Sequence, residues 1–149
     1  MNYYASQVIT PIVGTKDSSL SPTGVTLEST YQTEGTGKPT KSFATGGFEK
    51  ITIDAIYTMG ATETSNSIEV KMESSEDGTN WYRISNESTT AGTTTLTAKE
   101  ITFVGANAAA ATFSVILNIA YKFMRVSFKE TGVATNKGTV YAEITLSGK

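Results

Sequence analysis

The chain has 149 residues, which fits one domain of ordinary size that can bury a core without disulfides. It contains no cysteine and no histidine, which excludes disulfides, thiolate chemistry, Cys/His zinc sites and histidine-based catalytic triads. Its 12 basic and 14 acidic residues form no basic stripe, so the sequence does not predict a nucleic-acid-binding surface. We therefore expect a protein that is not an enzyme and uses no cofactor.

Charged residues make up only 17% of the chain, below the roughly 25% of an ordinary domain, and Thr, Ser and Gly take their place. A polar but weakly charged surface suits packing against other proteins, although a β domain with a Thr-rich exterior would have the same composition. No apolar run approaches the length of about 18 residues that a membrane helix needs. The first six residues show no signal-peptide pattern, so we expect neither a membrane partner nor signal-dependent secretion.

The N-terminal part of the chain, residues 1–46, contains all three prolines, Pro11, Pro22 and Pro39. Proline restricts strands to sheet edges, so the strand candidates at 7–13 and 24–31 predict edge strands or arms. We predict an extended N-terminal arm and linker over residues 1–46, which pairs with a neighbouring subunit or else folds back on its own domain.

The rest of the chain, residues 47–149, is dominated by strands in which apolar and polar residues alternate. The clearest patterns lie at 51–59, 68–73 and 140–147, where one face is apolar and the other polar, as in an antiparallel sheet with one wet face. Turn signals separate them from further strand candidates at 80–84, 93–97, 100–104, 112–119 and 122–129. A short run at 106–111 fits one helical turn or a loop. The pattern predicts an all-β antiparallel sandwich, jelly-roll or Ig-like.

The segment from Ser75 to Ile84 predicts a hairpin, because Asp77 can accept backbone hydrogen bonds and Gly78 can adopt positive φ. Trp81 follows and is the only tryptophan. We expect its ring to anchor the core, so that Trp81→Ala costs about 3–5 kcal/mol, and we favour this over a role as a ligand platform. A calcium site among Glu73, Glu76, Asp77 and Asn80 is the alternative for the loop, but the spacing is not that of an EF-hand.

Arg125 lies in a strand whose other face, formed by Met124, Val126 and Phe128, is expected to be core. Its guanidinium is predicted to form an ion pair within the chain, and an acid of another subunit is the alternative. The acids considered as partners within the chain are Glu69, Glu73 and Glu143.

A long amphipathic strand (48–59), an S-x-D-G-x-x-W hairpin (75–81), a late aromatic strand with an internal arginine (121–128) and a closing strand follow one another in the chain. This order resembles the small β-sandwich structural proteins of tailed bacteriophage virions, including capsid decoration and minor head or tail proteins. The resemblance covers residues 47–149. The same hairpin motif also occurs in carbohydrate-binding and discoidin-like sandwiches.

The resemblance implies a non-enzymatic virion protein, synthesised in the host cytoplasm, that packs on the major capsid protein or on neighbouring copies. It further implies a homo-oligomer, for which a trimer fits a capsid threefold position. The alternative function is a carbohydrate-binding module in which exposed aromatics stack on sugars, with Tyr82, Tyr57 and Tyr121 as the candidate rings.

Overall fold

The computed structural model describes residues 6–16, 22–98, 100–104, 110–119, 121–133 and 135–148. Within these ranges no residue is helical, and no helix spans a membrane. The strands are β1 (Ser6–Val13), β2 (Val25–Thr26), β3 (Thr40–Ala44), β4 (Lys50–Thr58), β5 (Ser67–Ser75), β6 (Tyr82–Arg83), β7 (Ser85–Thr90), β8 (Thr93–Ala98), β9 (Glu100–Val104), β10 (Ala110–Asn118), β11 (Phe123–Thr131) and β12 (Thr139–Ser147).

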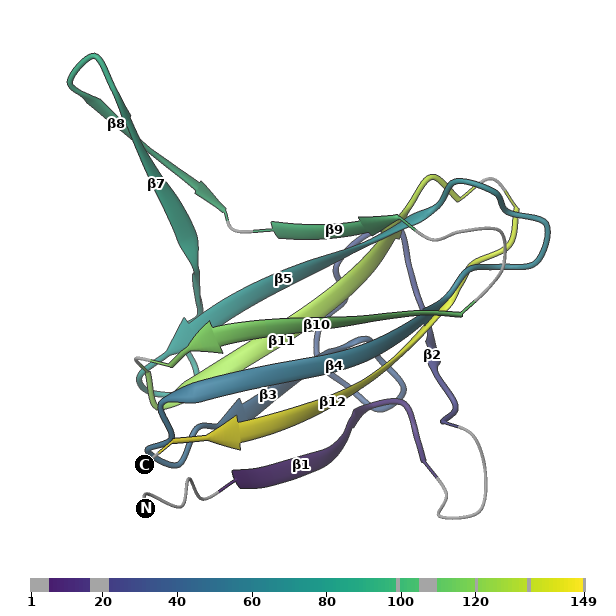
Figure 1. Cartoon of the computed structure of the whole chain (residues 1–149), viewed down its shortest axis with the longest axis horizontal. Helices are drawn as coiled ribbons and strands as arrows, with labels where there is room; N and C mark the ends of the chain where they lie inside the picture. The colour runs from purple at the N-terminus through teal and green to yellow at the C-terminus, as the bar shows by residue number, and fades with distance from the viewer. Residues whose placement is uncertain are drawn as a thin grey trace.

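Two antiparallel sheets pack face to face (Figure 1). The front sheet has the order β1-β12-β4-β10, and β2 extends the β1 edge along β12. The back sheet has the order β3-β11-β5, and β6 and β9 pair with successive parts of the remaining edge of β5. Strands β7 and β8 form a separate two-stranded hairpin that extends away from the sandwich in Figure 1.

The strand order distinguishes between the two predicted sandwich types. If the eight long strands of the two sheets are numbered in chain order, without β2, β6 and the β7–β8 hairpin, the sheets read 1-8-3-6 and 2-7-4-5. This is the order of a jelly roll, in which the chain alternates between two four-stranded sheets. The predicted all-β antiparallel sandwich is confirmed, and it is of the jelly-roll type.

The core lies between the sheets and is formed by the apolar faces that the alternating patterns predict. The buried residues include Ile51, Ile53, Ala55, Tyr57 and Met59 from the first predicted pattern, Ile68, Val70 and Met72 from the second, Met124, Val126 and Phe128 around Arg125, and Val140, Ala142, Ile144 and Leu146 near the end of the chain. Because a strand alternates its side chains, a slip of one residue would put Glu69 and Lys71 in place of these apolar residues.

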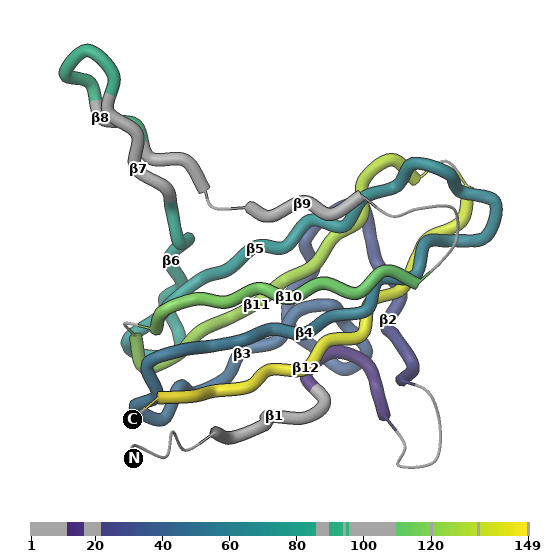
Figure 2. The backbone as a smooth tube through the Cα atoms, in the orientation of Figure 1, coloured from purple at the N-terminus to yellow at the C-terminus, as the bar shows by residue number. Residues whose placement is uncertain are grey.

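The N-terminal segment is part of the sandwich, so the predicted boundary between residues 46 and 47 does not separate an arm from a domain. β1 pairs with β12 in the front sheet, and β3 pairs with β11 in the back sheet. Leu27 is fully buried in the core, and its amide donates to Gly138 O at 2.9 Å. Between β2 and β3 the chain runs along the back sheet, where the amides of Glu130 and Phe128 donate to Glu28 O and Pro39 O, and Figure 2 traces this connection behind that sheet. This is the alternative in which the segment folds back on its own domain.

Four shorter strands differ from the sequence prediction. The candidate at 24–31 is a strand only at Val25–Thr26, and the one at 80–84 only at Tyr82–Arg83. β3, which lies inside the predicted linker, and β7 were not predicted. Of the run at 106–111, residues 106–109 lie outside the described part, and the last two belong to β10.

Candidate functional site

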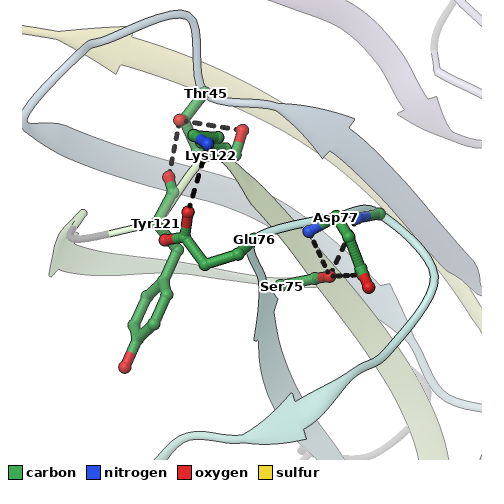
Figure 3. Close-up of polar contacts among 7 residues, drawn as sticks. Thr45, Ser75, Glu76, Asp77, Tyr121 and Lys122 are labelled. Carbon is green, nitrogen blue, oxygen red and sulfur yellow. Dashed lines mark hydrogen bonds and ion pairs between the residues drawn. The ribbon is translucent and has the colours of Figure 1, made fainter.

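The connection between β5 and β6 is held together by Ser75 and Asp77, as the hairpin prediction requires. Ser75 Oγ accepts hydrogen bonds from the amides of Asp77 (3.3 Å) and Gly78 (2.9 Å), contacts that Figure 3 draws. Asp77 Oδ1 accepts bonds from the amides of Thr79 and Asn80, both at 2.8 Å. Gly78 has a φ of 73°, which an L residue with a side chain rarely adopts. The predicted role of Asp77 and Gly78 is therefore confirmed.

The hydrogen bonds to Asp77 also bear on the calcium alternative. The bonds from the amides of Asn80 and Thr79, and then the Asn80 and Ser75 side chains, favour the charged carboxylate and lower the pKa of Asp77 far below its ordinary value. Both carboxylate oxygens are thus acceptors within the loop, since Asn80 Nδ2 donates to Oδ2 at 2.7 Å. In the part of the chain that the structure describes, no group of three or more acidic side chains is placed to hold a metal ion.

Trp81 is not a core residue, and the predicted core anchor is wrong. Its side chain is partly exposed and is absent from the buried cluster between the sheets. The ring lies against the guanidinium of Arg125, with Cζ 4.4 Å from the ring centroid. Arg125 is on the outer face of β11, so Trp81 packs on the outside of the back sheet. A guanidinium over an indole face is an attractive cation–π pair.

Arg125 forms the predicted ion pair within the chain, and its partner is Glu73 on the neighbouring strand β5. Arg125 Nε lies 2.8 Å from Glu73 Oε2, and the two residues face each other in the β11–β5 register. Lys71 Nζ contacts the other oxygen of Glu73 at 3.3 Å. Burial by itself would raise the pKa of Glu73, but the bond from Arg125 and the charges of Lys71 and Arg125 outweigh it and lower that pKa.

The exposed large apolar side chains of the described residues gather on one side of the sandwich, which we call the open flank. It runs along β10 at the edge of the front sheet and β6 at the edge of the back sheet. Ile116 on β10 and Tyr82 on β6 are each 69% exposed, and Tyr121, in the connection from β10 to β11, is 45% exposed. A hollow of about 260 Å³ lies here and is lined by both tyrosines, Arg83 and Asn118.

Tyr121 stands between this hollow and a second one of about 580 Å³, which Phe48, Glu76 and Lys122 also line. Thr45 fixes the connection that carries it, because Thr45 Oγ1 donates to Tyr121 O at 2.7 Å. Lys122 Nζ lies 3.6 Å from Glu76 Oε2. Figure 3 shows the Tyr121 ring pointing away from these contacts. The backbone is therefore fixed while the ring is presented to solvent.

Tyr57 does not belong to this surface, and its predicted role in glycan stacking is wrong. It lies on the inner face of β4 and is buried in the core. Its hydroxyl donates to Glu130, a fully buried carboxylate that also accepts the amide of Gly138 at 2.7 Å. Tyr57 points inward because it continues the apolar alternation of Ile51 and Ile53, and the pair with Glu130 satisfies its hydroxyl.

A polar groove on the outer face of the front sheet was not predicted from the sequence. It has a volume of about 370 Å³ and is lined by Lys16, Asp54, Ser114, Tyr141 and Glu143, among others. The β12–β4 register places Glu143 directly opposite Asp54. Each acid lies at a polar position of an alternating strand, so the sequence predicts that it faces outward. Their juxtaposition depends on which strands pair, and no local pattern shows this.

Both carboxylates of the groove have partners within the protein. Ser114 donates to Asp54, and Glu143 accepts from Tyr141 and from Lys16, the latter at 3.2 Å. The hydrogen bond from Tyr141 lowers the pKa of Glu143, burial opposes this, and Lys16 lowers it further. A glycosidase needs one carboxyl with a raised pKa as its general acid, and the shift of Glu143 has the opposite direction. Asp54 and Glu143 therefore serve as hydrogen-bond acceptors in this groove.

The structure thus brings Asp77, Gly78, Trp81 and Arg125 together at one end of the back sheet, with Tyr82 next to Trp81 on the open flank. Ile116, which the sequence analysis did not single out, lies on the same flank. The sequence does carry a signal for Ile116, because it is an apolar residue on the face of β10 that otherwise carries the polar Thr112 and Ser114. The chain matches no known protein-family model, and no curated protein shows significant similarity to it.

Proposed function

We propose that this protein is a non-enzymatic structural component of a virion, a capsid decoration or minor capsid protein that packs on neighbouring virion subunits. The observation that carries the proposal is the open flank, where Tyr82, Ile116 and Tyr121 are exposed beside an edge of β10 that no strand of the described residues pairs with. Exposed aromatic and apolar side chains grouped in this way are typical of surfaces that bind other proteins.

Two further features support an assembly role. Jelly rolls occur in viral capsid domains, although they also occur in lectins, so the fold supports the proposal only by analogy. Charged residues make up only 17% of the chain, and on the outer face of the back sheet Lys71 pairs with Glu73 and Lys129 with Glu69. A surface with little unpaired charge packs against a neighbour with a low desolvation cost. The partners are then the major capsid protein or other copies of the chain, and the protein resides in the virion.

The test is the presence of the chain in particles. Particles from a culture that makes this protein are purified on a density gradient, and the chain is quantified by mass spectrometry against the major capsid protein. We expect a fixed copy number in the particle band, retained after a salt wash. Intact particles without the chain would refute the proposal.

A carbohydrate-binding module is the second candidate, and the hollow between Tyr82 and Tyr121 is the observation in its favour. Two exposed rings beside Asn118 and Arg83 resemble a site where sugar faces stack on aromatics and hydroxyls bond to polar side chains. This candidate predicts a glycan-array signal that Tyr82→Ala and Tyr121→Ala each abolish, while Lys41→Ala, on the other side of the sandwich, leaves it intact. No signal with any glycan would exclude it.

A further inference from the structure

The free edge of β10 lacks the features that usually prevent an edge strand from pairing. β10 runs for nine residues and pairs with β4 without any shift of register from Ala110 to Asn118. It contains no charged residue and no proline. In the described part of the chain, no strand pairs with its other edge. Edge strands are normally protected by lysines, prolines or bulges, and a long regular edge without them is a place where another strand can add.

The backbone groups on this edge can be assigned. The amide of Ile119 donates to Glu49 O, on the β4 side, at 2.7 Å. Successive amides of a strand alternate between its two edges, so the amides of Thr112, Ser114 and Ile116 face away from β4. The side chains of the same three residues are exposed on the outer face of the sheet. The edge therefore presents donors and acceptors at every second residue, with no bulky charge beside them.

The chain also carries a strand pair that is suited to this edge. In the β7–β8 hairpin, pairing runs from Ser85↔Ala98 to Thr90↔Thr93, and the turn residues Ala91 and Gly92 have φ values of 50° and 76°. Positive φ at both positions is typical of a tight type I′ turn. A two-stranded hairpin alone is marginally stable in water and gains from a third strand. Its sequence has one charged residue, Glu87.

We propose that the edge of β10 receives the β7–β8 hairpin of a second copy of this chain, so that the front sheet continues from one subunit into the next. This deepens and rests on the proposed assembly function. The six-residue hairpin strands, about 20 Å long, fit within the nine-residue edge. Neither partner brings like charges into contact, and the new backbone hydrogen bonds supply affinity, as in other cases of strand addition.

The partner is a second copy because the hairpin does not reach its own β10. Ser85, at the base of the hairpin, lies beside Asn118 at the end of β10, where both line the 260 Å³ hollow. From there the hairpin extends away from the sandwich (Figure 1). The hairpin and the edge are different surfaces, so each copy uses one of each, and the contact generates a closed ring or a chain of subunits.

The test uses two kinds of variant. In the acceptor variant the β10 edge can no longer receive a strand, and in the donor variant the β7–β8 hairpin is removed. Ile116→Pro removes an amide that faces away from β4, so it blocks the edge and keeps the β10–β4 pairing. In the donor variant, Asn-Gly replaces Glu87–Leu96, which keeps the pairs Ser85↔Ala98 and Asn86↔Thr97. Ile116→Lys serves as a second acceptor variant. Circular dichroism verifies that each variant is folded, and sedimentation velocity gives its mass.

We expect the wild-type chain, of 15.8 kDa, to form oligomers, and each variant alone to be a monomer. The donor variant is eight residues shorter than the wild type, so its monomer is correspondingly lighter. An equimolar mixture of Ile116→Pro and the donor variant should form a one-to-one complex whose mass is the sum of the two chains, because one intact hairpin and one intact edge remain. Thr26→Pro is the matched control, since Thr26 is an exposed residue on the opposite edge of the same sheet, and it should leave the oligomer intact.

A wild-type chain that is monomeric at its highest soluble concentration would overturn this inference, as would folded variants that stay oligomeric or a mixture that forms no complex. These results are separable from the proposed function. A monomer that is found in purified particles contradicts only the contact between copies, whereas an oligomer that is absent from particles contradicts the virion role.

Discussion

The two long sides of the sandwich are built differently. One side, which we call the closed flank, consists of β1 and β2 at the edge of the front sheet and β3 at the edge of the back sheet. β1 contains Pro11, and its register with β12 shifts between Ile9 and Val13. A proline and a bulge both interrupt the row of backbone donors, so this edge does not offer a regular ladder to another strand.

On the open flank, β10 contains neither a proline nor a bulge. β10 keeps its register over its whole length, and three large apolar side chains are exposed along this flank. The N-terminal strands β1, β2 and β3 thus close one side of the jelly roll, while nothing in the described chain closes the other. A sheet protected at one edge and open at the other has a defined side for its partners, which limits uncontrolled association.

The largest expected effect is the difference in unfolding free energy between two truncations to alanine, one on each flank. Leu27 is fully buried beneath the closed flank, so Leu27→Ala should reduce the free energy of unfolding by about 2–5 kcal/mol. Ile116 is 69% exposed, so Ile116→Ala should change it by less than about 0.5 kcal/mol. Urea unfolding of both variants provides the measurement. Similar costs for the two would mean that the flanks do not differ as described.

A smaller effect is expected for Glu73, which holds the Arg125 side chain on which Trp81 packs near the open flank. Glu73→Gln should cost about 1–3 kcal/mol at neutral pH, because a charged hydrogen bond is lost. The folded-state pKa of Glu73 is lowered. Its stabilisation is therefore complete above the ordinary pKa of about 4.3 and is lost as the pH falls through the folded-state value.

The measurement for Glu73 is the difference in unfolding free energy between wild type and Glu73→Gln from pH 7 to pH 3. The difference should shrink toward low pH, because protonated Glu73 resembles Gln. Glu76→Gln is the control, since its pair with Lys122 at 3.6 Å is solvent-exposed and should contribute at most about 1 kcal/mol. A difference that is constant with pH would show that ionised Glu73 does not stabilise the fold.

The fold class followed from the sequence because alternation is a local property. The apolar faces around Ile53, Val70 and Ile144 each indicate a strand with one buried face, and all three are buried. The partners of each strand are not local, so the jelly-roll order was left open. The role of the N-terminal segment was left open for the same reason, since only the pairing of β1 with β12 and of β3 with β11 shows that these strands belong to the sandwich.

The site residues show the same difference between features set by neighbouring residues and features set by strand pairing. Asp77 and Gly78 were predicted correctly because a turn is specified by adjacent residues. The burial of Trp81 was predicted wrongly, because it depends on the outer face of β11 and on the position of Arg125 there. The pairing of Asp54 with Glu143 was missed, because it requires the β4–β12 register.

Trp81→Ala should cost about 1–2 kcal/mol, less than the 3–5 kcal/mol expected for a core tryptophan. The ring is partly exposed, and its main identified partner is the Arg125 guanidinium, a contact worth about 0.5–2 kcal/mol. Trp81→Phe keeps an aromatic face and should recover part of the loss. Thermal unfolding of the two variants measures both values. A cost above about 3 kcal/mol would restore Trp81 as a principal anchor of the fold.

The smallest effect on stability is expected for the rings of the open flank themselves. A Tyr82→Ser, Tyr121→Ser double variant should unfold within about 0.5 kcal/mol of wild type, because both side chains lie on the surface and neither belongs to the buried core. Its binding to particles, measured by co-sedimentation, should fall more than about tenfold, because buried tyrosines at an interface commonly contribute about 2 kcal/mol each. Thr26→Ser on the closed flank is the control and should bind normally. If the double variant binds like wild type, these rings do not contact the partner, and the free edge of β10 remains as the part of the open flank that does.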